Sequence, residues 1–142
     1  MDYRAAFQIS AAGMATEKLR LDVTALNLAN MHAAGTSAEQ VYRPQRVLTQ
    51  ALGFGAQFGR LAAAQAGGSR AVVVAQDKTA RMVHEPGHPY ANAQGMVAYP
   101  GVDHVAEMVT LNAALRAYEA NVTAMNAART MAARTLDIGG QA

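Results

Sequence analysis

Apolar side chains recur at alternating intervals of four and three residues near the start of the chain. Residues 3–30 contain no proline and a single glycine, Gly13. Positions three and four apart share one face of a helix, so the pattern predicts a long amphipathic helix. One stripe comprises Phe7, Ala11, Met14, Leu21, Ala25 and Leu28, with Lys18 in its polar position. Beside it lies a second stripe of Ala5, Ile9, Ala12, Leu19, Val23 and Leu26.

The C-terminal segment, residues 103–142, repeats this pattern. Asp103 follows the break at Pro100-Gly101 and is a candidate N-cap, while Gly139-Gly140 is expected to end the helix. An alanine-rich flank lies next to the apolar stripe and would let a neighbouring backbone approach closely. The stripe comprises Met108, Leu111, Leu115, Tyr118, Val122, Met125, Ala132 and Leu136, with Arg129 in its polar position.

Two adjacent stripes give each predicted helix a broader apolar face than one partner helix covers. The simplest arrangement pairs the two helices as an antiparallel, coiled-coil-like hairpin, which accounts for one stripe on each. The second stripe would then be exposed in a monomer, and soluble monomers generally avoid large exposed apolar patches. We therefore expect these faces to be buried against other subunits.

The middle of the chain has a different character, with glycine, proline and polar residues between short runs of β-formers. Ala51–Ser69, rich in alanine, glycine and glutamine, is expected to be a flexible or extended loop. The predicted fold class is α+β: helices in residues 1–32 and 103–142, with a small β-rich module inserted at 33–102. The expected strands are Tyr42–Gln50, Ala71–Ala75, Arg81–His84 and Met96–Tyr99.

Composition and charge exclude several classes of function. The net charge is only +2 and the basic residues are scattered, which does not favour nucleic-acid binding. There is no cysteine, so disulfides and thiolate metal sites are excluded. No apolar run approaches the roughly 20 residues that cross a bilayer. The periodicity of the N-terminal residues continues past any cleavage point, so we expect no cleaved signal peptide.

One motif resembles a zinc-protease signature in its letters alone. His84-Glu85-Pro86-Gly87-His88 fits H-E-x-x-H, which requires both histidines on one face of a helix. Pro86 and the following Pro89 disfavour helical geometry here, so the motif predicts a turn. No other catalytic constellation is visible. We therefore expect no enzyme activity, catalytic residue, cofactor, metal site or small-molecule substrate.

Polar residues within the predicted helices carry two further expectations. Asn30 suits a helix C-terminus, whereas Asn27 lies within the last turn and could hold a turn or bond to a neighbouring subunit. The acidic residues are expected to be solvated or paired between subunits. These are Glu17, Asp22, Glu107 and Glu119.

The segment Leu19–Asn30 resembles the N-terminal signature of flagellar rod and hook proteins, the flagellar axial family. The stretch His84–Pro89, the residues Gly95-Met96-Val97 and the stretch Tyr99–Asp103 are similar to those of a proximal-rod member. Met108-Val109 and Tyr118–Val122 extend the resemblance along the C-terminal helix. Another rod or hook-type axial protein, or a cytosolic helical adaptor, is the alternative.

The resemblance implies a structural subunit of the proximal rod of the flagellar basal body. Such a subunit polymerises through its terminal helices and transmits torque from motor to hook and filament. It reaches the periplasm through the flagellar type III export apparatus, without a cleaved signal peptide. The partners implied are further copies of the chain, the rod proteins FlgB, FlgF and FlgG, and the adaptor FliE. The residues expected at subunit contacts are Phe7, Met14, Leu21, Asn27, Leu28, Asn30, Met108, Leu111, Leu115, Tyr118, Asn121, Val122, Met125 and Leu136.

Overall fold

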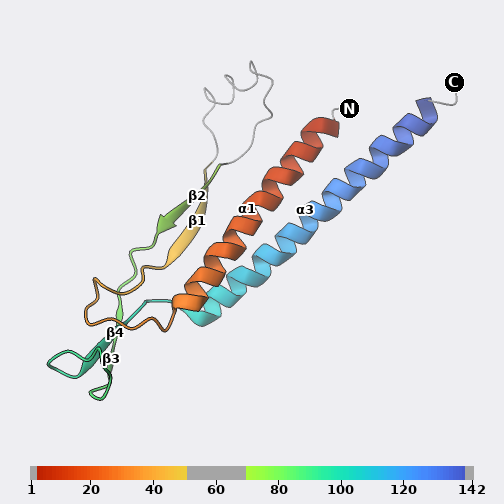
Figure 1. The fold of residues 1–142 in the computed structure, drawn as a ribbon. Coiled ribbons are helices and arrows are strands. Elements are labelled where there is room, and N and C mark those ends of the chain that lie inside the picture. The colour runs from red at the N-terminus through yellow and green to blue at the C-terminus, as the bar shows by residue number, and fades with distance from the viewer. Residues whose placement is uncertain (1–2, 51–69, 140–142) are drawn as a thin grey trace. The chain divides into compact units, whose positions relative to one another are not determined.

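The computed structural model describes residues 3–50 and 70–139. It confirms the predicted α+β fold, with a long helix at each end and small sheets between them (Figure 1). The predicted loop at 51–69 lies outside the described residues. In chain order the elements are α1 (Tyr3–Asn30), β1 (Gln45–Gln50), β2 (Arg70–Ala75), β3 (Arg81–His84), β4 (Met96–Tyr99) and α3 (His104–Gly139).

Local side-chain hydrogen bonds lie at the end of α1 and at the start of α3. The Asp103 carboxylate accepts from the backbone N–H groups of Val105 at 3.0 Å and Ala106 at 3.2 Å. It therefore caps the start of α3, as its sequence position predicts. In the last turn of α1, the Asn30 side-chain amide donates to the Leu26 carbonyl oxygen at 2.8 Å.

Two small sheets form the middle of the chain. Strand β3 pairs antiparallel with β4, in a register that places Arg81 opposite Tyr99, and β1 pairs with β2. Ala98 of β4 also exchanges two backbone hydrogen bonds with Gly35, at 2.9 and 3.0 Å. Strand β4 is therefore bonded on both edges, and Val97 and Ala98 are fully buried.

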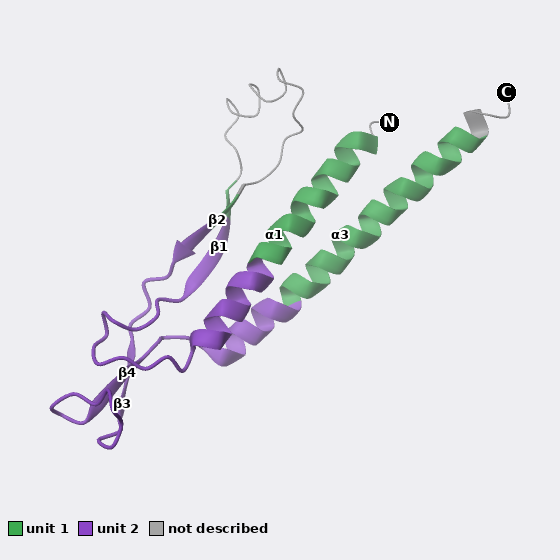
Figure 2. Ribbon diagram, in the orientation of Figure 1, with its two compact units in different colours: residues 1–19, 49–72, 113–142 green, residues 20–48, 73–112 purple. Residues whose placement is uncertain are grey.

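The chain forms two compact units, and both helices run through both of them (Figure 2). Unit 1 comprises residues 1–19, 49–72 and 113–142, and unit 2 comprises 20–48 and 73–112. The division predicted from the sequence, at 32/33 and 102/103, stays a prediction. Unit 2 buries apolar side chains from a helix, from the segment before β1 and from the strands, including Val23, Val41, Val47 and Val97. In the described part of unit 1 the buried residues are all small: Ser10, Thr16, Ala114 and Ala128.

In unit 1 the two helices run antiparallel and approach closely. Tyr3 and Thr135 share a hydrogen bond of 2.9 Å between their hydroxyl groups. Further along, a Cβ added to Gly13 would lie 2.5 Å from Oδ1 of Asn121. A side chain at position 13 would therefore displace the Asn121 amide, which explains a glycine in mid-helix despite its cost of about 1 kcal/mol relative to alanine.

The expectation that one apolar stripe of each helix fills this pairing stays a prediction. Of the two stripes predicted on α1, only Val23 is buried, and no member of the α3 stripe is. The other members of these stripes are half-buried or exposed. The buried positions of the helices are Ser10, Thr16, Val23, Thr24 and Asn27 on α1, and Glu107, Ala114 and Ala128 on α3.

Within residues 3–50 and 70–139, neither helix combines the length and the apolar character that a membrane crossing requires.

Gly95 provides a test of the turn between β3 and β4. Its φ of 71° lies in the left-handed region, and an added Cβ would approach Cε1 of His84 at 3.0 Å. We expect Gly95→Ala to lower the free energy of unfolding by about 1–2 kcal/mol. Gly95→Asn should cost less, because asparagine tolerates this conformation. Urea unfolding of the three chains measures the effect, and equal midpoints for wild type and Gly95→Ala would contradict it.

Candidate functional site

The H-E-x-x-H letters form a turn, as the prolines predict. The backbone N–H of His88 donates to the Glu85 carbonyl oxygen at 3.0 Å. The Glu85 carboxylate accepts from the Tyr99 hydroxyl at 3.0 Å, and Nδ1 of His88 accepts from the Tyr90 backbone at 3.2 Å. Among the described residues, no three histidine, aspartate or glutamate side chains gather as metal ligands would.

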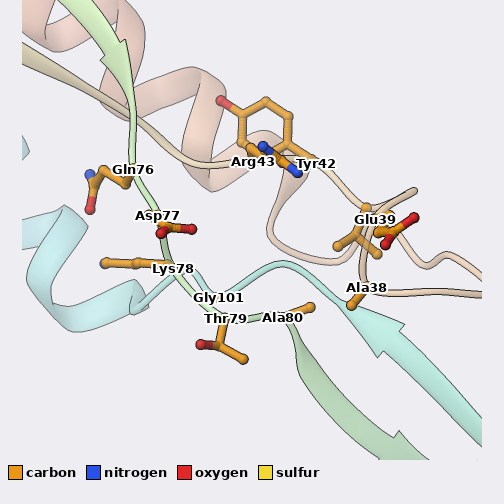
Figure 3. A pocket seen from close by; sticks show the side chains of 11 residues that line it. Ala38, Glu39, Tyr42, Arg43, Gln76, Asp77, Lys78, Thr79, Ala80 and Gly101 are labelled. Carbon is orange, nitrogen blue, oxygen red and sulfur yellow. The ribbon is translucent and has the colours of Figure 1, made fainter.

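A pocket of about 270 Å³ lies between residues 38–43 and 76–80 (Figure 3). Two acidic and two basic side chains line it: Glu39, Asp77, Arg43 and Lys78. All four are exposed to solvent. Ligand sites are typically apolar clefts with a few desolvated polar groups, so this lining is that of a surface hollow.

The side chain of Asn27 is only 1% exposed and bonds through both ends of its amide. Its amide nitrogen donates to the Gln45 carbonyl oxygen at 2.8 Å and to Oε2 of Glu107 at 3.2 Å. Its oxygen accepts from the Tyr42 hydroxyl at 2.8 Å and from the Gln45 backbone N–H at 2.9 Å. Asn27 thus joins α1 to α3 and to the start of β1. We call Asn27, Tyr42, Gln45 and Glu107 the Asn27 junction.

The sequence-based expectation that Glu107 is solvated or paired between subunits is wrong. Glu107 is 7% exposed and bonds within the chain to Asn27. It lies in the first turn of α3, where the helix dipole favours a negative charge. A buried carboxylate here was not recognisable from spacing alone, because its partner lies 80 positions away. Asn27 had a signal in the sequence, being a weak helix former inside a helix.

The residue that follows strand β2 is hydrogen-bonded to the Asn27 junction and to the residue before it. The backbone N–H of Gln76, just beyond β2, donates to the carbonyl oxygen of the buried Pro44 at 2.7 Å. The side-chain amide of Gln76 donates to the Gln45 carbonyl oxygen at 3.3 Å. No buried side-chain nitrogen or oxygen in the described part of the chain lacks a hydrogen-bond partner.

The predicted subunit contacts fall into three groups by exposure, and their assignment as contacts stays a prediction. Asn27 is buried, with its amide committed inside the chain. Met108, Leu115 and Leu136 are exposed, Leu136 by 77%. The other ten are half-buried: Phe7, Met14, Leu21, Leu28, Asn30, Leu111, Tyr118, Asn121, Val122 and Met125.

Further large apolar side chains on the helices are also exposed, although the prediction did not select them as contacts. Val105 is 70% exposed, Val109 64% and Ile9 61%. Leu26 and Met131 complete this set. These positions and the exposed predicted ones give the helices apolar surface that the described chain leaves uncovered.

Comparison with known proteins places the chain among the structural proteins of the flagellar basal-body rod. Residues 93–138 match the family described as flagellar basal body rod FlgEFG protein C-terminal. The chain is 37% identical to the flagellar basal-body rod protein FlgC of Bacillus subtilis, with 92% of this chain and 94% of that protein covered. It is 35% identical to FlgC of Salmonella typhimurium and 37% identical to FlgC of Escherichia coli, each time over 94% of this chain and 95% of the relative. The chain belongs to the FlgC family of flagellar basal-body rod proteins.

Tyr42 gives the Asn27 junction a dependence on alkaline pH. Burial, and then the nearby Glu107 carboxylate, raise the pKa of the Tyr42 hydroxyl above its ordinary value of 10.0. The folded chain therefore favours the protonated phenol. The stability this contributes is complete below pH 10 and is lost as pH rises through the higher pKa of the folded state.

We expect the free energy of unfolding to fall above pH 10 and to fall less steeply in Tyr42→Phe. At neutral pH the substitution should cost about 1 kcal/mol for the lost hydrogen bond. Urea unfolding from pH 7 to 11 measures both effects. Tyr90→Phe is the matched control, because Tyr90 is 51% exposed and lies outside the Asn27 junction. Parallel profiles for wild type and Tyr42→Phe would contradict the assignment.

Proposed function

We propose that this chain is a structural subunit of the proximal rod that polymerises through its terminal helices and transmits torque from motor to hook and filament. It acts without catalysis, cofactor or small-molecule substrate, and without nucleic acid. Membership of the FlgC family supports the place in the basal body. The distribution of side chains on the helices supports the mode of assembly.

The observation that carries the proposal is the apolar surface that the helices expose. On α3, Val109, Met131 and Leu136 are more than half exposed. Burying an apolar side chain of this size contributes about 1.5–3 kcal/mol. Packing these faces against the helices of neighbouring subunits would supply that contribution many times over. Dense contacts of this kind resist deformation, which torque transmission requires.

The neighbours we propose are further copies of the chain, the rod proteins FlgB, FlgF and FlgG, and the adaptor FliE. The subunit would reach the periplasm through the flagellar type III export apparatus without a cleaved signal peptide. Deletion of the gene tests the function as a whole. We expect non-motile cells whose basal bodies, seen by electron microscopy, stop near the inner membrane. Complete rods, hooks and filaments in the deletion strain would overturn the proposal.

Two adjacent positions on α3 test the mode of assembly. Met131 is 52% exposed and apolar, whereas Thr130 is exposed and polar, with its hydroxyl donating to the Asn126 carbonyl oxygen. Neither side chain is buried in the chain, so a glutamate at either position should leave the subunit folded. At Met131, however, a charge would have to be desolvated when subunits pack.

We expect Met131→Glu to reduce swimming in soft agar at least tenfold and Thr130→Glu to have little effect. Both proteins should be produced and exported at wild-type levels, which immunoblots of cell fractions check. Wild-type swimming by Met131→Glu, or equal losses in the two variants, would contradict a specific role for the apolar face.

A further inference from the structure

We propose that Asn27 and Glu107 are positioning residues that couple the pairing of α1 and α3 to the placement of strand β1. The claim deepens the proposed function and rests on it for its consequence in the rod. The coupling itself is a property of the single chain.

First, position 27 requires a side chain that both donates and accepts two hydrogen bonds. An asparagine side chain offers two N–H donors and an oxygen that accepts two hydrogen bonds. All four are used, with donor–acceptor distances between 2.8 and 3.2 Å. Aspartate has no donor when ionised, and serine or threonine has only one. At 1% exposure, water cannot readily replace a missing partner.

The second step is the way in which the amide meets β1. It accepts from the N–H of Gln45 and donates to the carbonyl of the same residue, at 2.9 and 2.8 Å. Two residues opposite each other in an antiparallel sheet exchange this same pair of bonds. The side chain of α1 therefore takes the place of a neighbouring strand at the first residue of β1, and fixes where that strand starts along the helix.

The third step is Glu107, which brings α3 into the arrangement. The second amide hydrogen of Asn27 has its acceptor on α3, 3.2 Å away. If α3 were displaced, the hydrogen bond between this donor and the Glu107 carboxylate would be broken. The Tyr42 hydroxyl reaches the same amide from the segment before β1. A single amide group therefore responds to the position of α3 and holds the segment that begins β1.

Swapping the hydrogen-bond donor and acceptor between positions 27 and 107 tests the coupling in the purified full chain. Asn27→Asp keeps the shape of the side chain but removes its donors and faces Glu107 with a second carboxylate. We expect amide hydrogen exchange in residues 41–47 to accelerate about tenfold or more, and motility to be lost. Combining Asn27→Asp with Glu107→Gln supplies a new amide donor from α3. The double variant should recover most of the protection and of the swimming.

Asn112→Asp is the matched control, because Asn112 is exposed and its amide donates only within α3, to the Met108 carbonyl oxygen at 2.9 Å. In Asn112→Asp, amide hydrogen exchange in residues 41–47 should be as slow as in the wild type. Should Asn27→Asp fail to fold, restored folding in the double variant still supports the coupling. Unchanged protection in Asn27→Asp, a double variant no better than the single one, or a wild-type chain unprotected at 41–47 would each overturn it. Any of these leaves the proposed function standing, whereas a complete rod in the deletion strain removes that function and leaves the measured coupling.

Discussion

The Asn27 side-chain amide is the interaction on which the placement of the middle segments depends. It bonds at once to Tyr42 in the segment before β1, to the first residue of β1, and to Glu107 of α3. Gln45 in turn accepts from Gln76, which carries the connection to the end of β2. Breaking the amide would leave buried polar groups without partners, at a cost of about 1–3 kcal/mol each. A network of this kind specifies one arrangement because partly satisfied alternatives are unfavourable.

A second constraint is the close approach of α1 and α3 at Gly13. Gly13 lies so close to Asn121 that a Cβ would be 2.5 Å from its oxygen. A side chain larger than that of glycine at position 13 would displace the Asn121 amide. In the described part of unit 1 the fully buried apolar residues are the alanines Ala114 and Ala128, and long helices gain most of their stability from packing of an apolar face. This is the physical basis for proposing that neighbouring subunits complete the packing.

Local features of the fold were predictable because their causes lie within a few residues. Asp103 caps α3 where the preceding Pro100-Gly101 break suggests, and Pro86 and Pro89 prevent a metal-binding helix at His84–His88. Strands β3 and β4 have the predicted limits. The fate of Glu107 was not predictable in this way, since a charged residue in a first helical turn is ordinarily solvated. Its burial depends on Asn27, which comes into contact only after α1 and α3 have paired.

Short-range patterns in the sequence were enough to predict the element order, the two long helices and the turn at the histidine motif. These follow from short-range periodicity, capping and the fixed backbone angle of proline. Which helix positions are buried could be seen only in the folded chain. Burial of a helix residue depends on the approach of segments distant in sequence. The tertiary structure also decided that one amide satisfies three separate segments, because hydrogen bonds between residues 18 and 80 positions apart leave no periodic trace in a sequence.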